Sequence, residues 1–259
     1  MTPAVPVEKP DYGIDAPQVL RNLFLYGTAC LGLGVFGPRH VHLGPVDLLL
    51  RPMFFWTGLV LVLQGFLYLF YVKAGKFRHR DLMLTLHRWR GDELVLDVGC
   101  GRGLLLAGAA KRLASLGDGG HVTGIDIWSN EDMGGNSEAA TLHNLDLEGI
   151  RDRCTLLSVS AQEMPFPDAS FDVVVSNLCL HNIYVRKVRH KALEEVARVL
   201  KPGGVALISD YKLTAEYAEE LGLAGFAVER RWGNPLFTFP PLRIVIARKP
   251  LVNRGGEIP

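Results

Sequence analysis

The stretch that decides the fold is Leu96-Asp97-Val98-Gly99-Cys100-Gly101-Arg102-Gly103. It follows the apolar pair Leu94-Val95 and leads into an apolar run, Leu104 to Leu113. This order predicts a strand, a tight glycine turn and a helix that starts at the turn. Glycines allow the backbone to approach a ligand closely, and a helix start offers free N–H groups. The stretch therefore predicts a nucleotide-type cofactor site at the carboxyl edge of a parallel sheet, with Asp97 beside it.

The glycine spacing in this turn is G-x-G-x-G, which differs from the G-x-G-x-x-G pattern of dinucleotide folds. One strand–helix unit later, a second predicted strand ends in an acid, Asp126, which is placed to bind the hydroxyls of a ribose. Three further segments follow in order: Ser160-Ala161-Gln162, the run from Met164 to Asn177, and Leu200-Lys201-Pro202-Gly203-Gly204.

These segments together, over roughly residues 90–249, resemble the class I S-adenosylmethionine-dependent methyltransferases. The resemblance implies an α/β, Rossmann-like sheet of seven strands with helices on both faces and a closing antiparallel hairpin. It also implies S-adenosyl-L-methionine as the cofactor. The activated methyl group of that cofactor leaves positioning and desolvation as the main tasks of the protein.

The resemblance further implies which residues hold the cofactor. Asp97 would lie near its amino-acid part, Asp126 would accept hydrogen bonds from the ribose, and Asn177 would face the reactive methyl group. Ser160 stands where the family often has an aspartate beside the adenine. The full expected cofactor set is Asp97, Gly99, Cys100, Gly101, Gly103, Asp126, Ile127, Ser160, Ala161, Gln162 and Asn177.

His181 is the candidate catalytic residue, because it follows Asn177 closely and an imidazole can act as a general base near neutral pH. The alternative interpretation is a structural histidine that contacts the amino-acid end of the cofactor. No spacing of histidine, cysteine or acidic residues suggests a metal site.

The first ninety residues have a different composition. Residues 1–18 are polar and rich in proline, which predicts a mobile tail. Residues 19–72 predict a transmembrane hairpin with spans at about 22–38 and 53–72. The second run carries no charge over twenty residues, enough to cross a hydrocarbon core of about 30 Å. The alternative is a pair of helices buried in a soluble core or a dimer interface.

Basic residues set the expected orientation of the hairpin. Six of them follow the second span within residues 73–90, against two in the loop between the spans. The positive-inside rule therefore places the catalytic domain in the cytoplasm. Residues 73–90 are predicted to form a basic linker, 91–250 the methyltransferase domain and 251–259 a tail.

Composition limits the function classes. The net charge is +1, so nothing suggests a nucleic-acid partner. The four cysteines form no paired motif and are interpreted as free thiols. The leading hypothesis is a membrane-anchored methyltransferase that acts on a small or lipophilic acceptor. Two alternatives are a non-catalytic cofactor-binding or assembly protein, and a nicotinamide-dependent oxidoreductase, which the glycine spacing and the segment at 200–204 disfavour.

Overall fold

A seven-stranded sheet forms the centre of the C-terminal domain in the computed structural model, which describes residues 8–129 and 134–251. The strand order is β5-β4-β3-β6-β7-β9-β8, with β9 antiparallel to its two neighbours and the other pairs parallel. This is the predicted sheet with its closing hairpin. The strands are β3 (Leu94–Val98), β4 (His121–Ile125), β5 (Cys154–Leu157), β6 (Phe171–Asn177), β7 (Leu200–Asp210), β8 (Ala227–Trp232) and β9 (Arg243–Arg248).

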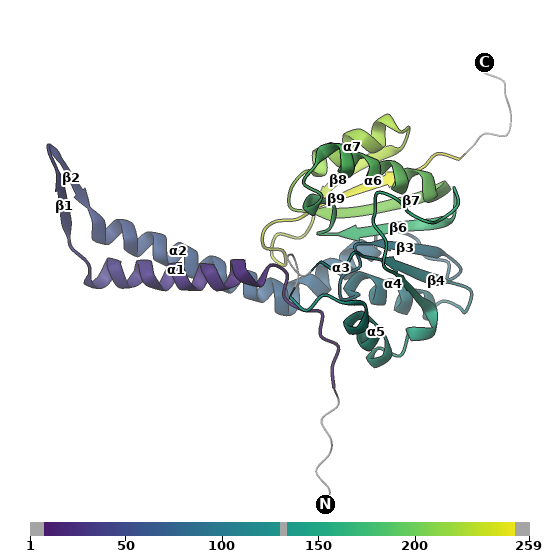
Figure 1. Cartoon of the computed structure of the whole chain (residues 1–259), viewed down its shortest axis with the longest axis horizontal. Helices are drawn as coiled ribbons and strands as arrows, with labels where there is room; N and C mark the ends of the chain where they lie inside the picture. The colour runs from purple at the N-terminus through teal and green to yellow at the C-terminus, as the bar shows by residue number, and fades with distance from the viewer. Residues whose placement is uncertain (1–7, 130–133, 252–259) are drawn as a thin grey trace, which may run out of the picture.

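Helices cover both faces of the sheet (Figure 1). Neighbouring residues of one strand point to opposite faces, so Val173 joins one core cluster and Val174 the other. Buried strands of this kind read as continuous apolar runs. The helices of the domain are α3 (Lys76–Leu84), α4 (Leu104–Ala114), α5 (Glu138–Leu147), α6 (Arg186–Val199) and α7 (Thr214–Leu223), with short 3-10 turns at Arg151–Arg153 and Leu180–Asn182.

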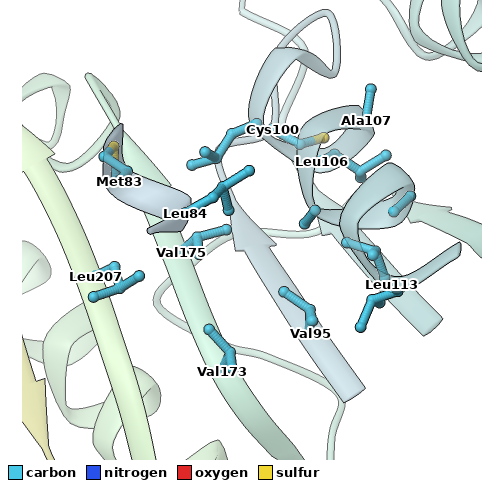
Figure 2. Close-up of a cluster of buried hydrophobic side chains, with 14 of the residues drawn as sticks. Met83, Leu84, Val95, Cys100, Leu106, Ala107, Leu113, Val173, Val175 and Leu207 are labelled. Atoms are coloured by element: carbon cyan, nitrogen blue, oxygen red, sulfur yellow. The ribbon is translucent and has the colours of Figure 1, made fainter. Parts of the chain in front are cut away.

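Residues 76–84 do not form the linker that the basic pattern predicts. They form α3, whose last residues Met83 and Leu84 are fully buried against the sheet beside Leu106 of α4 (Figure 2). His79 of the same helix is also buried, and its Nε2 lies 2.7 Å from Ser209 Oγ on β7. The prediction of a linker was wrong because this helix contains many charged residues and only a few apolar ones, so its sequence shows no clear apolar face.

The N-terminal region is a helical hairpin that projects from the domain as a rod (Figure 1). Its helices are α1 (Pro17–Phe36) and α2 (Leu50–Phe70), joined at the far end by β1 (His40–Leu43) and β2 (Val46–Leu49). Glycines bring the two helices close together: a Cβ at Gly34 would lie 2.5 Å from the backbone of Phe55, and one at Gly58 would lie 2.6 Å from that of Leu31.

Helix α2 runs without a break through a π-helical turn, Tyr71–Gly75, into α3. Two helical stretches, Pro17–Phe36 and Leu50–Leu84, are long and apolar enough to cross a membrane. In their most apolar windows only 11% and 17% of the residues are buried inside the protein. Side chains such as Phe36, Trp56 and Phe66 are exposed. This exposure disagrees with the alternative of helices buried in the core of a soluble chain.

The predicted mobile tail lies partly outside the described residues, since nothing is described before residue 8. Residues 8–16, in contrast, form an ordered strap across the C-terminal domain. Tyr12 is buried and its hydroxyl donates to Glu148, while Asp11 pairs with Arg102. For residues 8–16 the prediction of a mobile tail was wrong, because partners more than 50 residues away in the chain satisfy the polar groups of the strap.

Candidate functional site

The glycine turn lies at the carboxyl edge of the sheet, between β3 and α4, as predicted. Gly99, Gly101 and Gly103 all have positive φ angles, which glycine adopts without strain. At Gly99, however, it is a side chain of the protein, and not a ligand, that leaves no room for a Cβ. A Cβ added there would lie 2.1 Å from Cys179 Sγ. At Gly103 it would lie 2.9 Å from a methyl group of Thr141. These two glycines are therefore required by packing within the fold.

Asp126 follows β4 and fixes the glycine turn. Its Oδ2 accepts a hydrogen bond of 2.8 Å from the backbone N–H of Gly101, and its Oδ1 accepts one of 2.6 Å from that of Trp128. Asn136 Nδ2 lies 3.3 Å from Oδ1. The carboxylate thus connects the turn to the loop after β4, and it stands at the strand end where the prediction places a ribose ligand.

A narrow cavity of about 50 Å³ opens on the other side of the turn, next to Asp97 and Asn177. Both side chains point an unpartnered buried oxygen atom at this region, Oδ2 of Asp97 and Oδ1 of Asn177. Burial, together with the nearby charge of Asp126, raises the pKa of Asp97 to about 8. Buried polar atoms without partners are rare, so these two oxygens indicate a place for a polar ligand.

The strap and the base of the hairpin form the opposite wall of this cavity, which the sequence did not indicate. Tyr12 and Asp15 come from the strap, and Tyr71 and Lys76 from the helix that continues α2. Lys76 is buried, and its Nζ donates hydrogen bonds of 2.8 Å and 2.6 Å to the carbonyls of Tyr12 and Gly13. In the sequence Lys76 belongs to a run of basic residues of the kind that flanks membrane spans. Nothing in its neighbourhood therefore showed that this lysine, unlike an exposed one, would be buried.

The remaining residues of the predicted cofactor set lie along the same edge. Ile127 is 69% exposed, although it directly follows a buried strand, so its side chain is free to contact a ligand. Ser160, Ala161 and Gln162 form a half-buried turn after β5, in which Ser160 Oγ accepts from the Gln162 N–H at 3.4 Å. Cys100 is buried, and burial holds the pKa of its thiol well above the usual range, so it has no nucleophilic character.

His181 lies in the short turn after β6 and pairs with a buried acid. Its Nδ1 is 2.8 Å from Oδ1 of Asp210, a fully buried residue at the end of β7. The other oxygen of Asp210 accepts from the backbone N–H of His181 and from the Tyr217 hydroxyl. The two atoms are close but not aligned as a hydrogen bond, so the contact is electrostatic, and Nε2 is the ring nitrogen that does not face Asp210. The ring also packs edge-on against Tyr211, with centroids 4.8 Å apart.

Residues 96–208 match the family model described as a methyltransferase domain. This stretch of the chain is similar to methyltransferase domains. Within the described residues, no group of three or more histidine, cysteine or acidic side chains is arranged to hold a metal ion.

Curated relatives agree with this assignment. A ubiquinone/menaquinone biosynthesis C-methyltransferase of Vibrio campbellii is 37% identical over 122 residues, which are 47% of this chain and 42% of the relative. A sterol 4-C-methyltransferase of Caenorhabditis elegans is 35% identical over 48% of this chain and 33% of its own length. The 27-O-demethylrifamycin SV methyltransferase of Amycolatopsis mediterranei is 34% identical over 58% and 54%. The chain thus spans about a third to a half of these relatives.

Solved structures share the fold. A SAM-dependent methyltransferase from Aquifex aeolicus is 22% identical with a TM-score of 0.50, over 66% of this chain and 88% of that one. A (4+2)-cyclase is 19% identical with a TM-score of 0.55, over 92% and 99%. A geranyl diphosphate C-methyltransferase from Streptomyces coelicolor was solved with S-adenosylhomocysteine; it is 16% identical with a TM-score of 0.51, over 66% and 78%. S-adenosyl-L-methionine is the cofactor with which these findings are consistent.

Proposed function

We propose that this protein is a membrane-anchored methyltransferase that transfers a methyl group from S-adenosyl-L-methionine to a small, lipophilic acceptor. The observation that carries the proposal is the shared cavity. One of its walls is the glycine turn after β3, and the other is the strap and the base of an apolar helical hairpin. An acceptor dissolved in the bilayer would therefore meet the cofactor where the hairpin joins the domain.

The residues of this edge fit the cofactor. The buried oxygens of Asp97 and Asn177 have no partner within the described residues and offer acceptors for the amino group of its methionine part. Asp126 would bind the ribose, and exposed Ile127 beside it would offer an apolar contact for the adenine. When bound, the cofactor supplies an activated methyl group, and the protein positions the acceptor and removes its proton.

His181 is the residue that would remove this proton. Asp210 orients the imidazole and stabilises it once it becomes positively charged, as a buried carboxylate does in other histidine-based sites. An acceptor that is already ionised needs no such base.

We further propose that the hairpin crosses the membrane and that the domain faces the cytoplasm. Helix α2 has 21 residues, about 31 Å at 1.5 Å per residue, which matches the hydrocarbon core of a bilayer. The basic residues after it, among them exposed Lys73 and Arg78, support the orientation. Curated relatives named for sterols and quinones are consistent with a lipophilic acceptor.

The alternative is a non-catalytic cofactor-binding protein of the same fold. The fold alone does not fix the reaction, since a structural neighbour is named as a cyclase and not as a methyltransferase. Purified full-length protein should transfer label from S-adenosylmethionine to at least one member of a panel of thiol, phenol, amine and lipid acceptors. Cofactor binding without transfer to any acceptor class would favour the alternative.

Replacing Asp126 by alanine should weaken S-adenosylmethionine binding by about 1.5–3 kcal/mol, the range for a hydrogen bond to a charged group. Because Asp126 also holds the Gly101 N–H, Asp126→Asn separates the two roles: it keeps an acceptor for the turn and removes the charge. Calorimetry measures both affinities, and Asp146→Ala, an exposed acid on α5, is the control. Wild-type affinity in Asp126→Ala would contradict the assignment.

Cofactor binding should also release a proton from Asp97 at pH 7. Its pKa of about 8 keeps the carboxyl group largely protonated in the free protein. The cationic ammonium and sulfonium groups of the cofactor favour the ionised form, so binding expels the proton. Titration calorimetry in two buffers of different ionisation enthalpy counts this proton. The release should vanish in Asp97→Asn and shrink in wild type at pH 9, and its persistence in Asp97→Asn would refute the role of this residue.

The same pKa has a consequence for stability. An aspartate in the unfolded chain titrates near pH 4, so between about pH 4 and pH 8 the folded state holds a proton that the unfolded state has lost. The contribution of Asp97 to the free energy of unfolding therefore falls as the pH rises through this window.

A further inference from the structure

A second cavity, of about 410 Å³, lies beside the site, between the start of α7, the end of β8 and the start of β9. Three cationic side chains line it, Lys212, Arg230 and Arg243, and its lining contains no acidic residue. Aromatic and proline side chains complete the wall, among them Tyr211, Trp232 and Pro240. A hollow that is basic and aromatic at once suits an anionic group attached to an apolar body.

Two of the three cationic side chains lie against aromatic rings, and the third donates a hydrogen bond to a hydroxyl group. The Arg243 guanidinium lies 3.8 Å from the centroid of the Trp232 ring, and Lys212 Nζ lies 5.2 Å from that of Tyr211. Arg230 donates to Thr214 Oγ1 at 3.4 Å. Within residues 8–129 and 134–251, none of the three has a carboxylate within 4.0 Å, whereas their neighbour Arg231 pairs with Glu229. Their positive charge is therefore available to a ligand.

The cavity lies at the level where the apolar hairpin ends. The loop between β8 and β9 packs against the base of α2: Phe239 contacts Tyr68 with ring centroids 6.5 Å apart, and Phe237 contacts Phe70 at 6.4 Å. Pro240, which lines the cavity, directly follows Phe239. If α2 crosses the bilayer, its end at Phe70 lies at the headgroup layer, and this cavity lies beside that layer.

Exposed aromatic side chains surround the opening. Trp232 is 60% exposed, Tyr184 is 77% exposed and Tyr211 is 43% exposed. Tryptophan and tyrosine are enriched at membrane interfaces, where their rings sit among the lipid headgroups, and lysine and arginine near that surface are attracted to anionic lipids. Both signals coincide at this cavity, and both are independent of the cofactor site.

We propose that this cavity binds the phosphate headgroup of an anionic phospholipid from the membrane that holds the hairpin. The proposal rests on the proposed membrane anchoring, but not on methyl transfer. The bound headgroup would fix the carboxyl edge of the sheet against the membrane surface. Because Tyr211 lies in this cavity and also packs against His181, the headgroup site and the proposed reaction site share a wall.

The test uses full-length protein in detergent, titrated with phosphatidylglycerol or phosphatidylcholine and read by native mass spectrometry. The wild type should bind phosphatidylglycerol at least tenfold more tightly than phosphatidylcholine. In the triple variant Lys212→Gln, Arg230→Gln, Arg243→Gln, the affinity for phosphatidylglycerol should fall at least tenfold. Each basic residue near an anionic lipid surface strengthens binding about fivefold. The matched control is Arg88→Gln, Arg112→Gln, Arg248→Gln, which removes the same charge at the opposite edge of the sheet and should change affinity by less than about twofold.

Two further measurements keep the proposal falsifiable if the triple variant fails to fold. In wild type, brominated phosphatidylglycerol should quench tryptophan fluorescence more than brominated phosphatidylcholine, and Trp232→Phe should remove the difference. Glycerol 3-phosphate and inorganic phosphate, added as competitors, should not displace the lipid at equal concentration.

The proposal is overturned if the folded triple variant binds phosphatidylglycerol like wild type, if quenching is the same for both lipids, or if the free phosphates compete as well as the lipid does. In the last case the cavity is a site for a soluble phosphate compound. Failure of the membrane anchor is recognised separately, because alkaline carbonate would then release the wild-type chain from membranes.

Discussion

Turnover should fall by about 10²–10⁴-fold when His181 is replaced by alanine, the share that general acid–base catalysis commonly supplies. The physical reason is the pairing of Nδ1 with buried Asp210, which leaves Nε2 as the proton acceptor. The rate is measured with a labelled cofactor and an acceptor from the panel described above. S-adenosylmethionine affinity, measured by calorimetry, should stay nearly unchanged, because His181 is not expected to bind the cofactor.

The variant Asp210→Asn tests the same assignment from the other side. Its single amide oxygen can still accept from the backbone N–H of His181 and from the Tyr217 hydroxyl, but the second acceptor oxygen and the negative charge are lost. Asparagine no longer stabilises a charged imidazole, so turnover should fall. His190→Ala is the matched control: this half-buried histidine on α6 pairs with Glu194 and Glu220, away from the site. If His181→Ala keeps its turnover, the acceptor ionises without help. If it loses cofactor affinity instead, the histidine has the structural role.

Replacing Lys76 by methionine should lower the melting temperature by about 6–12 °C and weaken cofactor binding at least tenfold. The substitution leaves the carbonyls of Tyr12 and Gly13 without their donor and Asp15 without its cation, whose Nζ is 4.0 Å from Oδ2. Breaking a buried charge pair lowers the free energy of unfolding by about 3 kcal/mol or more. The melting temperature of a domain of this size falls by about 2–4 °C for each kcal/mol of lost stability. Cofactor binding weakens because the released strap no longer forms a wall of the cavity.

Lys73→Met is the control for this experiment, since Lys73 is exposed on the same helix one turn earlier. It removes the same charge and should leave both the melting temperature and the affinity unchanged. Wild-type values for both quantities in Lys76→Met would show that the strap is not part of the cofactor site. The result also bears on truncation. A chain that begins at Gly75 would lack Tyr12, Asp15 and Tyr71, so it should bind the cofactor poorly.

The sequence predicted those parts of the site that local patterns encode. Apolar runs that end in Asp97 and Asp126 predict buried strands with polar ends, and the glycines between Gly99 and Gly103 predict the turn that follows. Parallel strands place all such ends on one edge. The expected cofactor set itself came from the resemblance to the methyltransferase family and stays a prediction. The sheet with its antiparallel end confirms the expected architecture.

Contacts between distant residues were beyond such patterns. Nothing near Lys76 in the sequence shows that its ammonium group meets the carbonyl of Tyr12, 64 residues away. Likewise His181 and Asp210 lie on separate strand ends, and only the pairing of β6 with β7 brings them together. The glycine at 99 was expected to make room for a ligand, yet the packing of Cys179 is what requires it.

The sequence by itself therefore determined the buried strands, the glycine turn and the apolar helices, because each follows from periodicity or composition within a short window. The seven-stranded sheet followed from the resemblance to the methyltransferase family. Only the tertiary structure decided that the strap and the base of the hairpin line the cavity beside Asp97, and that α3 is a core helix. The physical reason is that burial of a charge such as Lys76, or of Met83 among basic neighbours, depends on partners that folding brings from elsewhere in the chain.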